Sequence, residues 1–250
     1  MGFKVYIPAR LASTRLANKL LLDLGGEPVI AATARRALDS GADAVVLATD
    51  NQAIADAVAA LEVEVIRSQT PHDSGTDRIA EAARLGGEVD EQIIVNLQGD
   101  EAEMPPAVIA QVAALLAADQ AADIATIAEP LESEADFADP NIVKVVCDAD
   151  GHALYFSRAP IPWERDAGHG SAHREAGRRH VGIYAYRVAV LARFSNLAPA
   201  PLERLEALEQ LRALHHGMTI AVADAQAATG IGIDTAADLA RARARRGAGS

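Results

Sequence analysis

Hydrophobic positions follow two different spacings in the first half of the chain. Short apolar runs rich in valine and isoleucine predict β-strands at residues 3–7, 44–48, 63–66 and 93–97. Between these runs, apolar residues recur at helical spacing and predict helices at residues 28–40, 51–61, 76–85 and 106–118. Such regular alternation is typical of a parallel sheet that is covered by helices on both faces.

The second half of the chain is less regular. Its apolar patterns predict strands at residues 124–127, 143–147, 153–157, 181–186 and 219–223, and helices at residues 202–214 and 236–245. A polar, charged segment at residues 165–179 predicts a loop, and the basic end of the last helix is expected to be a solvated terminus that complements the helix dipole. Without a repeat or a clear linker, the sequence predicts one α/β domain over residues 1–250, with a mixed, mainly parallel sheet.

Composition narrows the class of protein. The chain has 250 residues, of which half are hydrophobic, so it can bury a substantial core. Its longest apolar stretches, such as residues 112–118, are too short for a membrane helix, and no secretory signal is evident, so we expect no membrane insertion and a cytoplasmic location. The net charge of −12 disfavours binding to nucleic acid. Cys147, the only cysteine, is expected to be a plain core residue.

The loop after the first strand carries candidate chemistry. Arg10, Arg15 and Lys19 stand within ten residues of one another, together with the hydroxyls of Ser13 and Thr14. The loop has neither the glycine and lysine spacing of a P-loop nor the glycines of a dinucleotide fingerprint. Cations and short donors are what a triphosphate requires, whereas a solvated surface loop is the alternative. The position after the first strand favours the triphosphate, because ligands of open α/β sheets bind beyond the carboxyl ends of the strands.

Two aspartates are candidate metal ligands. Asp100 follows the strand at residues 93–97 and the flexible Gly99, where a carboxylate is well placed to hold Mg²⁺ on a nucleotide. It would equally suit the start of a turn or a helix cap. Asp234 lies in a glycine-rich segment near the end of the chain, where the helix cap is by itself the favoured interpretation. Ser74 lies in a polar turn before a helix, which is a weak signal for an anion site.

Taken in order, these segments resemble the CMP-Kdo synthetase family, the 3-deoxy-manno-octulosonate cytidylyltransferases. The first-strand loop alone would fit several nucleotidyltransferases, including those for sialic acid. The segments 155–158 (Tyr-Phe-Ser-Arg) and 208–212 (Leu-Glu-Gln-Leu-Arg) are much more specific to the Kdo enzymes. The other matching positions are residues 7–10, 13–16, 48–50, 74–78, 95–96, 98–101, 143–146, 161–163, 179–180, 182–184, 202–203 and 232–235, with Lys19, His72 and Leu154.

The chain departs from the family pattern at three places. Ala17 and Asn18 stand where the family usually has Pro and Gly before the loop lysine. Asn tolerates a left-handed backbone better than most residues, so the loop is expected to keep its shape. Ala102 stands where the family usually has Pro, and the loop at residues 165–179 has no clear counterpart.

The resemblance implies a function and its sites. The fold would be a Rossmann-like nucleotidyltransferase domain that binds the nucleotide mainly through residues 1–120 and the sugar and a second subunit mainly through residues 121–230. The protein would be a cytoplasmic homodimer that transfers CMP from CTP to Kdo (3-deoxy-manno-octulosonate), releasing pyrophosphate and supplying CMP-Kdo for lipopolysaccharide biosynthesis.

The resemblance also implies residue roles. The implied catalytic residues are Lys19, Asp100 and Asp234, and both aspartates would hold Mg²⁺. The implied nucleotide-binding residues are Arg10, Ser13, Arg15, Lys19, Ser74 and Gln98. The implied sugar-binding residues are Gln98, Arg158, Arg165, His180, Tyr184, Glu209 and Gln210.

Two alternatives remain open from the sequence. The acceptor would be another sugar acid, such as 8-amino-Kdo or sialic acid, or the chain would be a non-catalytic nucleotide-sensing module. An NAD-dependent oxidoreductase, which is the default for alternating strands and helices, is disfavoured by the missing glycine fingerprint.

Overall fold

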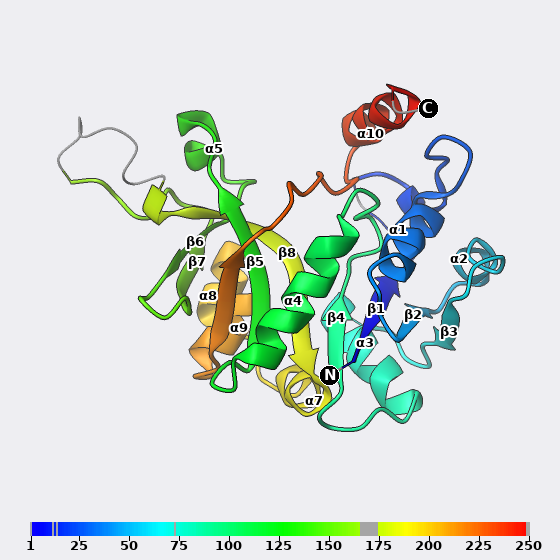
Figure 1. Cartoon of the computed structure of the whole chain (residues 1–250), viewed down its shortest axis with the longest axis horizontal. Helices are drawn as coiled ribbons and strands as arrows, with labels where there is room; N and C mark the ends of the chain where they lie inside the picture. The colour runs from blue at the N-terminus through cyan, green and yellow to red at the C-terminus, as the bar shows by residue number, and fades with distance from the viewer. Residues whose placement is uncertain (1, 12, 14, 73, 166–174, 249–250) are drawn as a thin grey trace.

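A central mixed sheet organises the protein. The computed structural model describes residues 2–11, 13, 15–72, 74–165 and 175–248, and within these ranges nine strands form one sheet. The strands are β1 (Phe3–Ala9), β2 (Ala44–Thr49), β3 (Glu64–Arg67), β4 (Ile93–Asn96), β5 (Ile124–Pro130), β6 (Lys144–Cys147), β7 (Ala153–Ser157), β8 (Arg178–Arg187) and β9 (Ile220–Asp224). Their main order is β3-β2-β1-β4-β8-β5-β9, and β6 pairs with both β7 and β8 (Figure 1).

The sheet combines a parallel half and an antiparallel insertion. Strands β1 to β4 are mutually parallel. Strand β8 then runs antiparallel to both β4 and β5, and β9 is parallel to β5. The predicted mixed sheet is therefore confirmed, and its all-parallel part lies in the first half of the chain, where strands and helices alternate.

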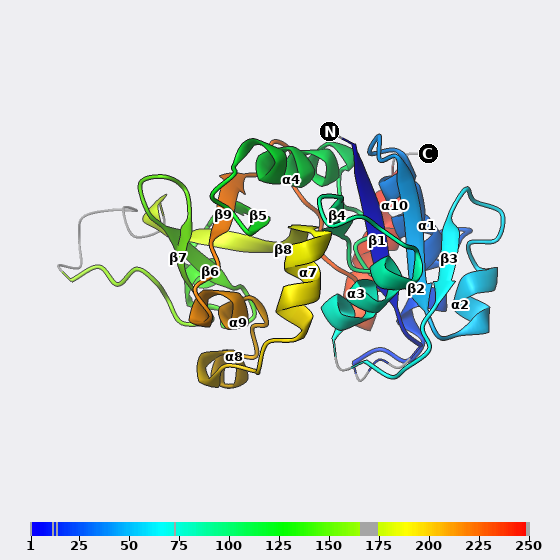
Figure 2. The ribbon, with the colours of Figure 1, turned by 90° about the horizontal axis from the view of Figure 1, so that it is seen from below.

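Helices cover both faces of this sheet (Figure 2). They are α1 (Val29–Leu38), α2 (Gln52–Asp56), α3 (Gly75–Leu85), α4 (Pro106–Ala118), α5 (Glu134–Ala138), α7 (Val188–Ser195), α8 (Pro201–Glu206), α9 (Gln210–His215) and α10 (Ala236–Ala248), with a short 3₁₀ turn, η1 (Lys19–Leu21). Helices α1 and α4 pack with one apolar cluster, whereas α3, α7 and α9 pack with the other. Within the described residues, no helix is both long and apolar enough to cross a bilayer.

Both faces of β1 are buried from Val5 to Ala9, which explains the apolar sequence of this part of the strand. The side chains of Val5 and Ile7 lie in the cluster with α1 and α4, and that of Tyr6 lies in the cluster with α3. A strand in a sheet covered on both sides reads as a continuous apolar run because successive side chains point to opposite faces.

The predicted helix at residues 202–214 is wrong as a single element. The structure divides it into α8 and α9 at Ala207, whose backbone is left-handed with φ of 49°. The break leaves Glu206 free to accept hydrogen bonds from Ser157 Oγ at 2.6 Å and from the Arg158 backbone N–H at 2.9 Å. The helices α5 and α7 were not predicted, because helices of two turns or fewer show little periodicity.

Candidate active site

A polar cavity of about 250 Å³ opens at the carboxyl ends of β1 and β4. The two strands are parallel neighbours, so the residues that follow them meet at the same edge of the sheet. Arg10 follows the last residue of β1, and Gln98 follows β4 after a single intervening residue. The cavity lies where the topology predicts a ligand site.

The structure gathers the predicted nucleotide and metal residues in this cavity. They come from the loop after β1, the start of α3, the turn after β4 and the segment before α10. The predicted residues in the cavity wall are Arg10, Ser13, Arg15, Lys19, Ser74, Gln98, Asp100 and Asp234.

Lys19 connects the two predicted metal ligands. Its Nζ donates to a carboxylate oxygen of Asp100 and, at 2.8 Å, to Oδ1 of Asp234. The other oxygen of Asp234 pairs with the guanidinium of Arg15 at 2.9 Å. Burial opposes the charge of Lys19, but the two carboxylates outweigh burial, so the pKa of the Lys19 ammonium lies above its usual value. The lysine is therefore a permanent cation at the centre of the cavity wall.

The backbone before Lys19 adopts the conformation expected from the sequence. Asn18 is left-handed, with φ of 53° and ψ of 29°. Glycine fits such a position without strain, and asparagine is one of the few side chains that tolerates it. The expectation that Asn18 preserves the loop is confirmed in its backbone geometry.

The donor set of this cavity fits a magnesium ion that is carried by a polyphosphate. Asp100 and Asp234 already converge on one ammonium group, so a cation between their carboxylates is electrostatically favoured. The described residues contain no group of three or more metal-ligating side chains. Two carboxylates suit Mg²⁺, which usually keeps water and phosphate oxygens as its remaining ligands.

The start of α3 links the cavity to a second polar region. Ser74 caps the helix, because its Oγ accepts from the backbone N–H of Asp77 at 3.1 Å. Thr76, two residues later, donates from its hydroxyl to Oε2 of Glu209 at 2.7 Å. Burial raises the pKa of Glu209, although hydrogen bonds from Thr76 and Ser74 counteract this effect.

Four predicted sugar residues lie in this second region. The rings of His180 and Tyr184 lie 5.4 Å apart, centre to centre. Burial, with a smaller effect of the positive Arg179, lowers the pKa of His180 to about 3, so this imidazole is neutral. Among the described atoms, Oε1 of Glu209 and Nε2 of Gln210 are buried without a hydrogen-bond partner. Buried polar atoms of this kind usually indicate a missing partner, such as a ligand or a water molecule.

The two predicted sugar-binding arginines are placed differently. The Arg158 guanidinium donates from Nε to the carbonyl of Glu206 at 2.7 Å and from Nη1 to the carbonyl of Pro140 at 2.9 Å. It is therefore held by main-chain oxygens. Arg165 is exposed. Most of the predicted loop at residues 165–179 lies outside the described residues, namely residues 166–174.

Sequence reasoning gave no separate role to two groups at this site. Arg78 is a buried side chain in the cavity wall and is paired with Asp50 at 3.1 Å. The sequence indicated this arginine only as part of the matching segment 74–78. Burial, followed by the negative charges of Asp100 and Asp234, raises the pKa of Glu101 to about 8. Glu101 also lies in a matching segment, residues 98–101, but its burial depends on segments distant along the chain and so was not evident from the sequence.

Comparison with known proteins agrees with this geometry. Residues 5–220 match the family model described as Cytidylyltransferase. A 3-deoxy-manno-octulosonate cytidylyltransferase of Acidovorax ebreus (strain TPSY) is 51% identical over 251 residues, covering 96% of each chain. One of the same name from Yersinia enterocolitica is 50% identical, covering 98% of each chain. A solved CMP:2-keto-3-deoxy-manno-octonic acid synthetase complexed with CTP superposes over 100% of both chains, with a TM-score of 0.90 and 39% identity.

Proposed function

This chain belongs to the cytidylyltransferase family, and we propose on that premise that it transfers CMP from CTP to Kdo, giving CMP-Kdo and pyrophosphate. The observation that carries the proposal is the meeting of Lys19, Asp100 and Asp234 in one cavity at the carboxyl edge of the sheet. A nucleotidyltransferase needs such a combination of a fixed cation and metal-binding carboxylates to hold a triphosphate.

The cations of the cavity would bind the CTP phosphates. We assign this role to Arg10, Arg15 and Lys19, supported by the hydroxyl of Ser13. Ser74 and Gln98 line the same cavity and would contact the cytidine. Arginine and lysine suit phosphate because they combine charge with hydrogen-bond donation.

We assign Asp100 and Asp234 as the ligands of Mg²⁺. When bound, the ion neutralises phosphate charge and favours departure of pyrophosphate. Lys19 already bonds to both carboxylates, so it fixes their orientation and adds a positive charge beside the phosphates. Such preorganised charge stabilises the transition state without reorganisation during the reaction.

Kdo would bind in the adjoining polar region. We assign Gln98, His180, Tyr184, Glu209 and Gln210 to sugar binding. Oε1 of Glu209 has an ion-pair contact with Arg212 at 3.9 Å, but this oxygen and Nε2 of Gln210 are buried without a hydrogen bond, which supports this role because hydroxyl groups of a sugar would satisfy them. Arg158 and Arg165 are assigned to the same site on the family resemblance alone.

The chemistry is a substitution at phosphorus. The anomeric hydroxyl oxygen of Kdo forms a bond to the α-phosphorus, the bond from that phosphorus to the bridging oxygen breaks, and pyrophosphate leaves with the electron pair. The hydroxyl proton passes to solvent. Residues of the cavity and of the adjoining polar region would hold the Kdo hydroxyl in line with the bond that breaks at the α-phosphorus. Such positioning of the two reactants contributes to the rate.

The biological setting follows from the substrates. We propose that the protein acts in the cytoplasm, where CTP is available, and that CMP-Kdo serves lipopolysaccharide biosynthesis. We assign nucleotide binding mainly to residues 1–120, and sugar binding and dimerisation mainly to residues 121–230. Trp163 and Leu205, each 81% exposed, support a homodimer, because large apolar side chains on a surface often mark a subunit contact.

Pyrophosphate release tests the proposal directly. The purified protein is mixed with CTP and Mg²⁺ and then with Kdo, 8-amino-Kdo, N-acetylneuraminate or no acceptor. Release that requires Kdo and stops with EDTA is expected. Release with another sugar acid alone would change the acceptor and keep the reaction, whereas CTP binding without release for any acceptor would refute the enzyme assignment.

A further inference from the structure

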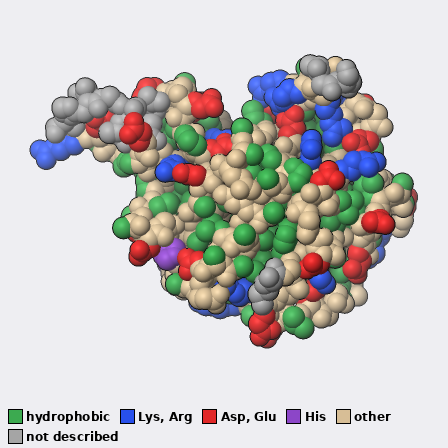
Figure 3. Space-filling model, viewed as in Figure 1, with side chains coloured by type: hydrophobic (Ala, Val, Ile, Leu, Met, Phe, Trp, Pro, Cys, Tyr) green, Lys and Arg blue, Asp and Glu red, His purple; other side chains and the backbone are tan. Residues whose placement is uncertain are grey.

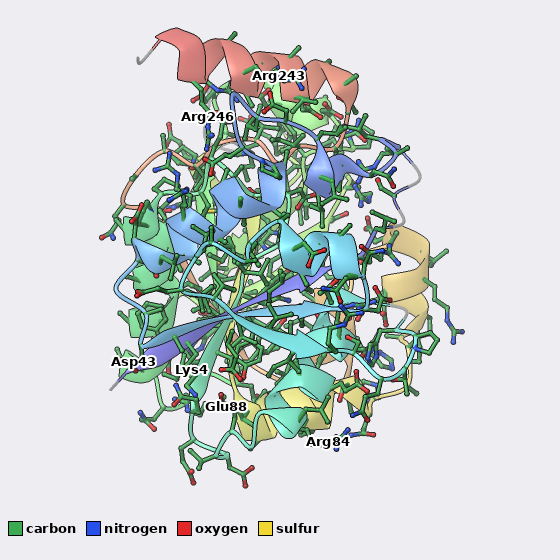
Figure 4. The ribbon with its side chains drawn as sticks, turned by 90° about the vertical axis from the view of Figure 1, so that its right-hand side faces the viewer. Lys4, Asp43, Arg84, Glu88, Arg243 and Arg246 are labelled. Atoms are coloured by element: carbon green, nitrogen blue, oxygen red, sulfur yellow. The ribbon has the colours of Figure 1, made fainter. Side chains whose placement is uncertain are left out.

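The last helix is bonded to the rest of the protein through its arginines. Arg243 donates from Nε and Nη2 to the carbonyl of Asp23 at 2.9 and 2.6 Å. Arg245 forms a two-pronged contact with the carboxylate of Glu103, whose Nε bond measures 2.8 Å. Arg246 donates to the carbonyl of Leu24 at 3.0 Å (Figure 4 labels Arg243 and Arg246). The expectation of a solvated basic terminus is therefore incomplete, because Arg243 and Arg245 are exposed but all three side chains also bond to other parts of the protein.

These contacts fall next to the segments that carry Lys19, Asp100 and Asp234, which we call the catalytic cluster. Asp23 and Leu24 follow η1, which begins at Lys19. Glu103 lies three residues after Asp100. In Figure 3 the Lys and Arg side chains gather at the upper right, on α10 and the chain below it, with Asp and Glu side chains between them.

The beginning of α10 is fixed to the third member of the cluster. Asp238 accepts from the backbone N–H of Thr235 at 2.8 Å and from that of Asp234 at 3.3 Å. Leu239 and Ala242 are buried in the main apolar cluster, so the helix also has an apolar anchor. Each segment that supplies Lys19, Asp100 or Asp234 is thus in contact with α10 or continuous with it.

The segment that leads to Asp234 also packs closely on the turn after β4. A β-carbon at Gly230 would lie 2.4 Å from Cβ of Glu103, and one at Gly232 would lie 2.8 Å from Oε1 of Glu101. Glycine is the residue that permits such a close approach of the two glutamate side chains to the backbone. Glu103 is therefore held between Gly230 on one side and Arg245 on the other.

We infer that α10 acts as a clasp that sets the distances between Lys19, Asp100 and Asp234, with Arg245 as a positioning residue. The inference rests on the proposed role of this cluster in binding the CTP phosphates. The three residues of the cluster are far apart along the chain, and the helix contacts or continues each of the segments that carry them. Loss of the Arg245–Glu103 contact loosens the turn after β4 and the approach to Asp234.

Arg241 provides a matched control on the same helix. Its side chain is 57% exposed, against 50% for Arg245, and it pairs with Asp238 within the helix. Arg241→Ala and Arg245→Ala therefore remove the same charge from similarly exposed positions, but only Arg245→Ala removes a contact between α10 and the turn after β4. Arg241→Ala leaves in place the bonds that Asp238 accepts from the backbone N–H groups of Asp234 and Thr235. Arg245→Lys tests whether the charge alone suffices.

The first measurement is amide hydrogen exchange of the full-length variants without ligand. Arg245→Ala is expected to speed exchange in the turn after β4 (residues 99–104) and in residues 230–235 by about 10-fold, while exchange in β4 stays unchanged. Arg241→Ala is expected to match the wild type in all three regions. Because Arg245 is half exposed, the melting temperature should fall by less than about 4 °C.

The second measurement is function. Misplacement of reacting groups by ~1 Å costs up to about 100-fold, so turnover in Arg245→Ala should fall by about 10-fold, with the KM for sugar unchanged. Arg245→Lys should restore part of the lost turnover. The double variant Arg245→Glu with Glu103→Arg, which exchanges the two charges, should have a higher turnover than either of its single variants. Equal exchange in the Arg245→Ala and Arg241→Ala proteins, or equally faster exchange in β4, would overturn the clasp. Hydrogen exchange is measured without substrate, so it tests the clasp even if the protein does not catalyse the proposed reaction. Failure of the clasp and failure of the proposed reaction are therefore distinguishable.

Discussion

Lys144 offers a sharp test of how the sugar side of the protein is held together. It is fully buried, at 0% exposure, on β6, and burial lowers the pKa of its ammonium group. Its Nζ donates to three main-chain carbonyls, those of Asp139 at 2.9 Å, Ile142 at 2.6 Å and Arg158 at 2.7 Å. Lys144→Met keeps the length of the side chain but removes all three bonds.

The expected loss of stability follows from these contacts. Each hydrogen bond to a charged group contributes ~1.5–3 kcal/mol, whereas burying the ammonium costs several kcal/mol, so the two effects partly cancel. We expect a net loss of about 3 kcal/mol, because three buried carbonyls lose their donor at ~1–3 kcal/mol each and removal of the buried ammonium offsets part of that loss. One carbonyl belongs to Arg158, so the KM for Kdo should also rise, while that for CTP should not.

Urea unfolding followed by circular dichroism measures this loss. Lys4→Met is the control, because Lys4 is a strand lysine that is partly exposed and pairs with Glu88 at 2.7 Å (Figure 4). Such a pair is worth at most about 1 kcal/mol. A Lys144→Met protein within ~0.5 kcal/mol of the wild type would show that the three carbonyls do not depend on the lysine, and would refute the reasoning.

Three further predictions concern the active site. Asp100→Asn should reduce turnover by at least about 100-fold, because it removes one preorganised charge, and near-normal steady-state rates would contradict the metal assignment. Asn18→Ala should destabilise the left-handed turn by ~1 kcal/mol in thermal unfolding, whereas Asn18→Gly should be tolerated; equal stability of the two variants would be inconsistent with the backbone geometry. His180 has a pKa of about 3 in the fold and about 6.5 when unfolded, so protons favour the unfolded chain between these values and stability falls as the pH falls below about 6.5. The free energy of unfolding is measured in urea at several pH values between these two pKa values. His180→Gln should reduce its slope with pH by up to ~1.4 kcal/mol per pH unit, and an unchanged slope would disprove the neutral state of the His180 imidazole.

The sequence determined the local features of the protein. Nearly continuous apolar runs identified β1, β2 and β4, because strands buried on both faces need apolar side chains at most positions. The residue types of the loop after β1 indicated a polyanion, and Asn18 indicated a left-handed turn. These features depend on neighbouring residues alone, so a single sequence reveals them.

Only the tertiary structure decided which of these groups meet. Lys19 bonds to residues 81 and 215 positions away, and no local pattern encodes such contacts. The raised pKa of Glu101 and the main-chain bonds of Arg158 likewise arise from segments that folding brings together. From the sequence, the arginines of α10 were predicted to form a solvated helix end. Arginines that bond to other segments have the same spacing along a helix as arginines that contact only solvent, so the sequence does not distinguish them. Their partners are fixed by the packing of α10 against the loop after η1 and the turn after β4, so these contacts emerged only from the fold.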